Sequence, residues 1–393
     1  MSDELARSIE QHVSTEEVVE VCRDLVRAPS ENPPGDEREV AEVAERWLGR
    51  LGLGTERVEP KPGRVSVLSS WGSGDRTLLF NGHYDVVPVS DPEHWPFPPF
   101  GAAVDDGKIF GRGTCDMKAG IASAIAAVAT LQRAGIDPDG RLLLHLVADE
   151  ETLGVWGTRH LVEAGYCDGA TEALVGEPTS MNLVTSERGA VWLRIFTEGS
   201  SAHGSTPQLG VNAIEHMARV VEAVRGIRFR KLHDVLGAPT VNIGTIRGGH
   251  KVNMVPDHCE IEIDRRTLPG ESTDEIVAEF EAALDRAREA EPGLRARIEV
   301  DDTAEAAETP PETSMVGLLA QGRDAFGVDG SEVGYMGATD ARYLINQGHI
   351  PSVIFGPGDI MLAHTTGEYV EIDSLVACTK VYAYAFAGYL AGH

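Results

Sequence analysis

The sequence is poor in cysteine, and the few cysteines that occur are scattered. Five are present among 393 residues, an odd number without any CxxC pair: Cys22, Cys115, Cys167, Cys259 and Cys378. This distribution argues against a disulfide scaffold and against a zinc site built from thiolates. Scattered, unpaired cysteines are typical of a reducing compartment, so we expect a cytoplasmic location.

Positive charge and long apolar runs are also scarce. Lys and Arg total 34 against 62 Asp and Glu, which gives a formal net charge of −28. Because binding to nucleic acid needs a cationic surface, we expect no nucleic-acid partner. No apolar run approaches the roughly 20 residues that cross a bilayer, and the acidic N-terminal segment lacks the apolar core of a secretory signal. We therefore expect no membrane association.

The composition that is present favours a globular chain with substantial cores. Hydrophobic residues make up 42% and charged residues 24% of the sequence, which are ordinary values for folded proteins. At about 150 residues per domain, the length predicts two or three domains.

The first half of the chain alternates helical and strand patterns. Apolar spacing predicts helices at 16–27, 37–50 and 119–135, and continuous apolar runs predict buried strands at 77–83, 141–150 and 173–178. This alternation is typical of an α/β fold, a mostly parallel sheet with helices on both faces. Ligand sites in such sheets form beyond the carboxyl ends of the strands, where His83, the Glu150–Glu151 pair and Glu177 stand.

A different pattern occupies residues 189–302, with the order strand, helix, strand, strand, helix, strand. This order is typical of a split βαβ sandwich. The acidic, proline-containing stretch 301–312 that follows is interpreted as a linker. We therefore predict a catalytic domain formed by residues 1–188 and 303–393, interrupted by a smaller α+β (βαββαβ) domain at 189–302 that forms a dimer surface or a lid.

Histidines and carboxylates that could bind metal are spread through the predicted catalytic domain: His83, Asp116, Glu150, Glu151, Glu177 and His364. No local pattern such as HExxH joins them, and each has an ordinary explanation when taken alone; Asp116 before a helix, for example, is more often an N-cap. Acids at several strand ends would nevertheless converge in one crevice, where their repulsion calls for a cation. Imidazole and carboxylate donors suit zinc, cobalt or manganese.

Two pairs of nearby residues suggest how the site is arranged. His83 and Asp85 share a face of an extended segment, so Asp85 can accept a hydrogen bond from the imidazole and orient it. Glu150 and Glu151 are adjacent, so if one binds a metal, the other stays within reach of the water on that metal. The pair can thus separate a ligand from a general base.

The ordered set of motifs resembles a di-zinc metallohydrolase family that includes acetylornithine deacetylase, succinyl-diaminopimelate desuccinylase, aminoacylase-1 and the glutamate-releasing carboxypeptidases. The resemblance runs from about residue 17 to about residue 385, and the matching segments are NGHYDVVP, DGKIFGRGTCDMKAG, ADEETLG, VGEPT, SAHGSTPQLGVNAI, VNMVPDHCEIEIDRRTLPG and AHTTGEYV.

The resemblance implies two divalent metal ions, zinc in the first place and cobalt or manganese as alternatives. Asp116 would bridge them, with His83 and Glu177 completing one site and Glu151 and His364 completing the other. The resemblance further implies that Glu150 is the general base and later the acid, that Asp85 orients His83, and that a cis peptide follows Asp116.

Residues of the inserted domain also match the family. The resemblance implies a homodimer in which His203 reaches the partner subunit's site and binds the developing oxyanion. It also implies that a carboxylate-bearing substrate is bound by Arg188, Asn253, Arg266, Gly337 and Thr339. The segment at 337–339 is Gly-Ala-Thr here, where relatives have Gly-Thr-Ser or Gly-Gly-Thr.

The activity implied by the resemblance is hydrolysis of the amide bond of an N-acyl amino acid or a related small molecule. The segment RTLPGES and the chain length favour the deacetylase and desuccinylase branch. A glutamate-releasing carboxypeptidase and a hydrolase of an unusual catabolic or xenobiotic amide stay open as alternatives. A non-catalytic metal-binding module and an acidic structural protein are the alternatives from other classes.

Overall fold

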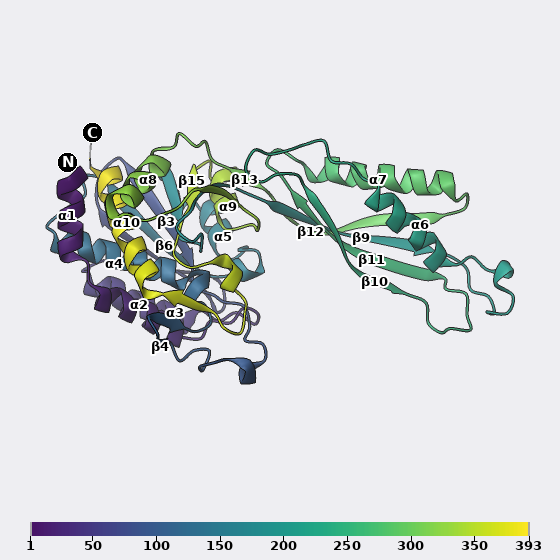
Figure 1. Ribbon diagram of the computed structural model, residues 1–393, viewed down its shortest axis with the longest axis horizontal. Helices are drawn as coiled ribbons and strands as arrows, with labels where there is room; N and C mark the ends of the chain where they lie inside the picture. Colours follow the sequence, from purple (N-terminus) through teal and green to yellow (C-terminus); the bar gives the residue numbers. More distant parts are fainter. Residues whose placement is uncertain (1, 392–393) are drawn as a thin grey trace. The chain divides into compact units, whose positions relative to one another are not determined.

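The computed structural model describes residues 2–391 and divides into two compact units (Figure 1). Unit 1 contains the chain up to Thr185, then Glu308–Val333, and then the chain from Thr339 onward. Unit 2 contains Ser186–Ala307 and the short segment Gly334–Ala338. The predicted fold class is confirmed: a large, mostly parallel sheet flanked by helices is interrupted by a smaller antiparallel α+β unit.

The large sheet has the strand order β1-β2-β6-β3-β7-β15-β8-β13, with β14 paired to β8. Neighbours β6, β3, β7 and β15 run parallel, whereas β1 and β2 are antiparallel additions at one edge. The strands are β1 (Thr55–Lys61), β2 (Arg64–Gly72), β3 (Thr77–His83), β6 (Arg141–Val147), β7 (Glu172–Val175), β8 (Leu183–Glu187), β13 (Ala307–Glu308), β14 (Glu332–Tyr335) and β15 (Ser352–Ile354).

Helices cover this sheet, and their apolar faces form one core with it. Buried residues of α2, α4 and α10 join those of β3 and β6 in one core, in which Phe80 packs edge-on against Tyr382. The helices of unit 1 are α1 (Ser2–His12), α2 (Thr15–Arg27), α3 (Arg38–Arg50), α4 (Ala119–Arg133), α5 (Thr158–Glu163), α8 (Ser314–Phe326), α9 (Ala341–Asn346) and α10 (Ile372–Leu390).

The alanine-rich helix α4 packs unusually close to the sheet. A Cβ atom at Gly120 would lie 2.0 Å from the carbonyl oxygen of Gly176, so only glycine allows this approach. Contrary to the sequence expectation, Thr114–Arg133 is long and apolar enough to cross a bilayer by length and composition. Its most apolar 18-residue window is entirely buried inside unit 1, which is the pattern of a core helix.

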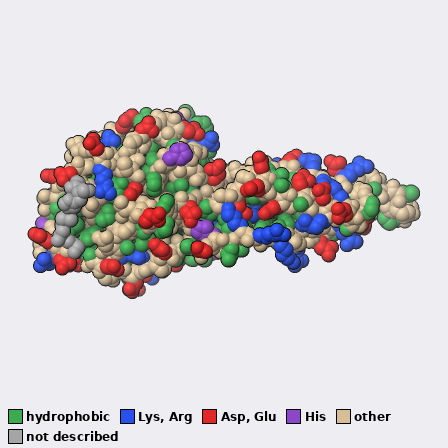
Figure 2. All heavy atoms as spheres, turned by 90° about the horizontal axis from the view of Figure 1, so that it is seen from above, with side chains coloured by type: hydrophobic (Ala, Val, Ile, Leu, Met, Phe, Trp, Pro, Cys, Tyr) green, Lys and Arg blue, Asp and Glu red, His purple; other side chains and the backbone are tan. Residues whose placement is uncertain are grey.

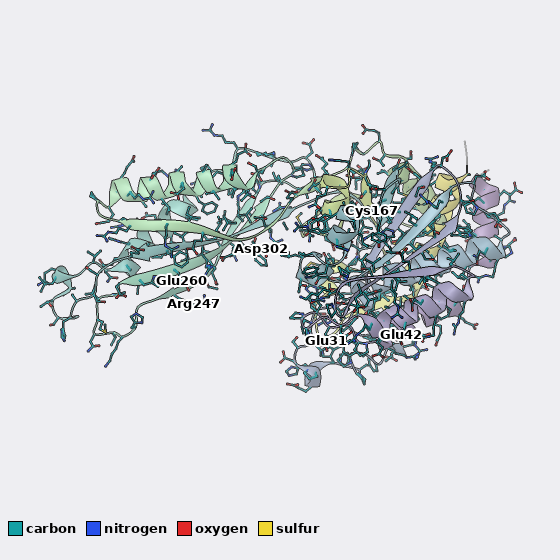
Figure 3. All side chains as sticks on the ribbon, turned by 180° about the vertical axis from the view of Figure 1, so that it is seen from behind. Glu31, Glu42, Cys167, Arg247, Glu260 and Asp302 are labelled. Atoms are coloured by element: carbon teal, nitrogen blue, oxygen red, sulfur yellow. The ribbon has the colours of Figure 1, made fainter. Side chains whose placement is uncertain are left out.

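Unit 2 is built on a four-stranded antiparallel sheet with the order β10-β11-β9-β12. Apolar residues alternate along β11, so Ile261 and Ile263 pack with Phe280 of α7 in a separate core. Arg247 on β10 and Glu260 on β11 form a cross-strand ion pair of 3.4 Å (Figure 3). The elements are β9 (Gly189–Glu198), α6 (Ala213–Arg225), β10 (Thr240–Gly248), β11 (His258–Thr267), α7 (Thr273–Ala290) and β12 (Arg295–Ala304).

The predicted linker at 301–312 contains the boundary between the two units, but part of it is strand. Strand β12 continues to Ala304, and β13 follows at Ala307–Glu308. Asp301 and Thr303 lie on exposed positions of β12, which hides the strand pattern because one face of an antiparallel sheet can face water. On the face of the molecule shown in Figure 2, acidic and basic side chains are interspersed, so the negative net charge is not gathered there in one acidic patch.

A third, small sheet completes unit 1. It has the order β16-β5-β4, formed by β4 (Ala103–Asp105), β5 (Lys108–Phe110) and β16 (Tyr369–Glu371). Through this sheet the segment just after His364 pairs with the segment just before Asp116, although about 250 residues separate them.

Candidate metal centre

Three neighbouring parallel strands deliver acids and a histidine to the same edge of the large sheet. Strand β3 ends at His83 and lies between β6 and β7. Glu150 and Glu151 follow the end of β6, and Glu177 follows the end of β7. The strand order therefore brings together side chains that are up to 94 residues apart.

Asp116 lies at the centre of this group, and its two oxygens face different histidines. Oδ1 is 3.1 Å from Nε2 of His83, and Oδ2 is 3.4 Å from Nε2 of His364. Glu177 lies 3.5 Å from the first imidazole, and Glu151 lies 3.3 Å from the second. Ligand atoms within 4.8 Å of one another thus form two groups that share Asp116: His83–Asp116–Glu177 and Asp116–Glu151–His364.

The geometry of His83 leaves one ring nitrogen for a metal. Its Nδ1 is 3.0 Å from the backbone carbonyl oxygen of Asp85, and because a carbonyl only accepts, Nδ1 carries the proton. Its Nε2 faces Asp116 and Glu177, so in the neutral imidazole the lone pair of this nitrogen is available to a metal. The Asp116–Met117 peptide is cis, as the resemblance implies.

The carboxylate of Asp85 has a wider role than the sequence spacing suggested. It lies 3.6 Å from the imidazole of His83, beyond a short hydrogen bond. Its two oxygens accept from the backbone N–H of Glu150 at 3.2 Å and of Glu151 at 3.1 Å, and the amide of Asn32 donates to it at 2.8 Å. One buried side chain therefore holds the turn that presents both glutamates.

Burial and crowding of negative charge perturb the carboxyl groups. Burial raises the pKa of Glu177 to about 7, with the charge of Asp116 acting in the same direction. Burial also raises the pKa of Glu151 and, well above its usual range, that of Glu150. Hydrogen bonds from His364 and His83 outweigh burial at Asp116 and lower the pKa of its carboxyl.

The same crowding of negative charge also raises the pKa of the two histidines, which favours their charged form. Hydrogen bonds with Asp116 and Glu151 raise the pKa of His364 to about 10. Burial alone would lower the pKa of His83, but Glu177 and Asp116 outweigh it and raise the pKa well above its usual range. Without a cation, protons must therefore balance the carboxylates. Imidazole nitrogen and carboxylate oxygen are donors for zinc, cobalt and manganese, so the residues present fit a pair of divalent ions.

Glu150 differs from its neighbour because it belongs to neither ligand group. Its carboxylate lies 4.0 Å from Nε2 of His83 and 4.0 Å from the guanidinium of Arg342. Only 12% of its side chain is exposed. Glu150 is thus a largely shielded carboxyl beside the centre that belongs to neither ligand group.

Several residues that support the centre were missed in the sequence. Arg64 is buried and bonds Glu37 at 2.6 Å and Asn32 at 2.7 Å, behind Asp85. Arg342 is buried and donates to the carbonyl oxygen of Thr339. A buried arginine cannot be recognised from its own sequence context, because arginine is usually exposed. Glu368 could have been noticed, since it lies within AHTTGEYV.

The other predicted site residues are placed as follows. His203 and Asn253 are exposed in loops of unit 2, where the Nδ1 of His203 lies 2.7 Å from the hydroxyl of Ser205. Arg188 belongs to unit 2, not to the first segment of the catalytic domain, and its guanidinium donates to the carbonyl oxygens of Leu236 and Ala238.

Two adjacent arginines on β11 have different surroundings. Arg265 is fully buried and pairs with Glu271, whereas Arg266 is partly exposed and bonds Asp264. Alternation along the strand thus leaves Arg266 as the accessible member of the pair. Gly337 lies in the return segment of unit 2, and Thr339 is buried in unit 1. Their substrate-binding roles stay predictions.

A third set of possible ligands lies apart from these two groups. Asp91, Glu93 and His94 are close enough to share an ion, but all three are exposed. Exposed acidic groups commonly occur without an ion, so the closeness of these three side chains does not by itself indicate a metal site.

Comparison with known proteins places this geometry in a family. The family model described as peptidase family M20/M25/M40 matches residues 79–387. Acetylornithine deacetylase of Myxococcus xanthus is 31% identical over 340 residues, covering 84% of each chain. A probable succinyl-diaminopimelate desuccinylase of Staphylococcus epidermidis is 26% identical over 406 residues, covering 96% of this chain and 99% of the relative.

Solved structures share the fold over nearly the whole chain. Aminopeptidase PepT of Bacillus cereus has a TM-score of 0.79 at 23% identity, covering 96% of this chain and 100% of that one. A dinuclear metal-binding M20 peptidase of Bacillus subtilis has a TM-score of 0.74 at 16% identity, covering 96% and 98%. The match to the family model and the 31% identity together show that this chain belongs to peptidase family M20/M25/M40.

Proposed function

We propose that this M20 hydrolase cleaves the amide bond of an N-acyl amino acid or a closely related small molecule, as a deacetylase or desuccinylase does. The observation that carries the proposal is the sharing of Asp116 by two ligand groups, with Glu150 beside them but outside both. The similarity to an acetylornithine deacetylase and a probable succinyl-diaminopimelate desuccinylase supports this class of substrate.

The two ligand groups would each hold one divalent ion, with zinc the first choice and cobalt or manganese as alternatives. When bound, such ions polarise a carbonyl group and lower the pKa of water enough to make it a nucleophile near neutral pH. The chain positions two of these donors before an ion binds. His83 is held by the hydrogen bond from Nδ1 to the carbonyl oxygen of Asp85, and Glu151 is held by the bond from its backbone N–H to the carboxylate of Asp85.

Glu150 is the proposed general base. Burial raises the pKa of its carboxyl, which strengthens it as a proton acceptor when it is ionised. It would take a proton from the attacking water and deliver it to the leaving nitrogen, so one residue would serve both halves of the reaction. The adjacent backbone N–H bond to Asp85 fixes the turn on which it stands.

Substrate binding and assembly form the remaining part of the proposal. Arg188, Asn253, Arg266, Gly337 and Thr339 would bind the carboxylate and amide of the substrate, where the planar fork of arginine matches a carboxylate. His203 would bind the oxyanion in the site of a partner subunit, which makes a homodimer the active form. The five cysteines are all free and buried, which is compatible with the proposed cytoplasmic location.

A side-by-side assay tests the proposal. Purified protein is stripped with a chelator, reloaded with zinc, cobalt or manganese, and given N-acetylornithine, N-succinyl-diaminopimelate and a pteroyl-glutamate mimic. We expect metal-dependent release of the free amine from one of the first two compounds. Release from the pteroyl-glutamate mimic alone would replace the proposal with a carboxypeptidase, and full activity of the stripped protein would overturn metal dependence.

A further inference from the structure

Glu368 is a buried carboxylate outside the two ligand groups, and its contacts join the turn that carries Asp116 to the loop that carries His364. It directly precedes β16 and follows His364 by four residues. Its relative exposure is 1%. A carboxylate at this depth is stable only when donors surround it, so the identity of its donors indicates what it does.

Its donors lie on the turn that carries Asp116. Oε1 accepts from the backbone N–H of Cys115 at 2.9 Å and from that of Asp116 at 3.3 Å. Oε2 accepts from the guanidinium of Arg112 at 2.5 Å. Arg112 is itself buried and lies 3.4 Å from the carbonyl oxygen of Thr365, the residue after His364.

These bonds join two metal ligands that are far apart in the sequence. The loop that presents His364 and the turn that presents Asp116 are held together by one side chain and its arginine partner. Oδ2 of Asp116 and Nε2 of His364 are 3.4 Å apart, and both belong to the group that also contains Glu151. Small displacements of either segment would change this separation directly.

We propose that Glu368 is a positioning residue for the ion held by Asp116, Glu151 and His364. It sets the affinity of that ion by fixing the Asp116 turn against the His364 loop. The inference rests on the proposed two-ion function. The ion held by His83, Asp116 and Glu177 depends on it less, because His83 ends strand β3 and Glu177 closely follows strand β7 of the large sheet.

Unit 2 contains a matched arrangement without any metal ligand. Glu271 accepts from the guanidinium of Arg265 at 2.8 Å and from the backbone N–H of Leu268 at 2.7 Å. Arg265 is fully buried, as Arg112 is. A substitution at Glu271 therefore reproduces the loss of a carboxylate bound to a buried arginine, without touching the centre.

The test compares Glu368→Gln with Glu271→Gln in the full chain. In either variant, an amide N–H₂ group replaces one carboxylate oxygen. Because this group can only donate, it cannot accept the hydrogen bond that the replaced oxygen received. Stripped protein is titrated with Co²⁺ in competition with a chromophoric chelator, and the absorbance of bound cobalt reports its coordination. We expect Glu368→Gln to weaken one of two sites by about 10- to 100-fold, the range for outer residues of metal sites, and to alter that site's absorbance. Glu271→Gln should bind both ions like the wild type.

A second variant, Glu368→Asp, and the wild-type protein itself complete the test. Glu368→Asp retains the charge but has a shorter reach, so we expect a smaller weakening of the same site; this variant also serves if Glu368→Gln does not fold. Wild-type affinity at both sites in a folded Glu368 variant would overturn the positioning role. Failure of the wild-type protein to bind two ions would overturn the proposed function instead, so the two failures are distinguishable.

Discussion

Asp85 accepts a hydrogen bond from the backbone N–H of Glu150, with 3.2 Å between Oδ1 and N. The same carboxylate accepts from the N–H of Glu151 and from the side chain of Asn32, and all three partners are donors. An ionised carboxylate is acceptor-only, so it satisfies them together. This single side chain thus positions both the proposed base and one proposed ligand.

Asp85→Asn should disturb the centre although it changes only one atom. The amide must turn its N–H₂ toward at least one donor, which loosens the turn that bears Glu150 and Glu151. We expect metal affinity or turnover to fall by about 10- to 100-fold, as is usual for residues behind metal ligands. Metal titration and steady-state kinetics measure this effect.

Asp24→Asn is the control for that experiment. Asp24 accepts from the indole N–H of Trp47 at 3.2 Å, on helix α2 of the same unit. It touches no ligand, so metal binding should not change. If Asp85→Asn behaved like Asp24→Asn in both assays, the positioning role of Asp85 would be refuted.

The adjacent glutamates should respond differently to the same substitution. Glu150→Gln is expected to retain both ions while turnover falls by about 10²- to 10⁴-fold, the usual contribution of a general base. Glu151→Gln is expected to lose one ion, because Glu151 belongs to a ligand group and Glu150 does not. Metal content by elemental analysis separates the two cases, and loss of metal from Glu150→Gln would reassign that residue as a ligand.

The proposed action of His203 in a partner's site can be tested by mixing inactive variants. His203→Ala and Glu150→Gln are each expected to have low activity alone. If His203 acts across the dimer, a hybrid contains one site with an intact Glu150 and an intact partner histidine, so activity should reappear after mixing and subunit exchange. If it acts within its own chain, every site carries a lesion, and a mixture without recovered activity would exclude the trans arrangement.

The sequence was sufficient to predict that the side chains of the centre lie close together, because their closeness depends on the order of the strands. His83, Glu151 and Glu177 stand just beyond buried apolar strands, and parallel neighbours place such ends together. The pairing of individual atoms could not be predicted in the same way. That the N–H of Glu151 donates to Asp85 depends on backbone dihedral angles in a turn, including the positive φ of 73° at Asp149.

Polar residues were the main source of error. The acidic, proline-containing pattern at 301–312 predicts a linker, and the boundary between the two units falls there, but residues 301–304 and 307–308 form strands. The buried side chains of Arg64 and Arg342 were missed, because their burial depends on partners that lie far away in the sequence. Apolar periodicity reports what an element packs against, whereas the burial of a charge depends on the whole fold.

A pair of glycine substitutions tests the close packing of α4. Gly120→Ala places a methyl group 2.0 Å from the carbonyl oxygen of Gly176, so helix and strand must separate. We expect destabilisation of about 1–3 kcal/mol. Gly317→Ala in helix α8 meets nothing within 4 Å and should stabilise by about 0.5–1 kcal/mol, because alanine favours helix. Denaturant unfolding of both variants gives the comparison, and equal effects would contradict the packing argument.

His145 provides a test of pH dependence away from the centre. It is buried on β6, with its Nδ1 3.9 Å from the sulfur of Cys167 (Figure 3), and burial lowers its pKa from 6.5 to about 3. Between pH 6.5 and pH 3 the imidazole is therefore protonated in the unfolded chain but not in the folded chain. The free energy of unfolding consequently decreases as the pH falls from 6.5 toward 3. Between pH 7 and pH 5 this loss amounts to about 2 kcal/mol.

Replacing the titrating group should remove that part of the loss. His145→Gln cannot bind the proton, so its free energy of unfolding should fall by about 2 kcal/mol less than that of the wild type between pH 7 and pH 5. The variant is expected to be less stable at pH 7, which is why the pH-dependent difference, and not the absolute stability, is the measurement. His94→Gln at an exposed position is the control. Parallel pH profiles for the wild type and His145→Gln would mean that this imidazole accepts its proton in the folded chain too.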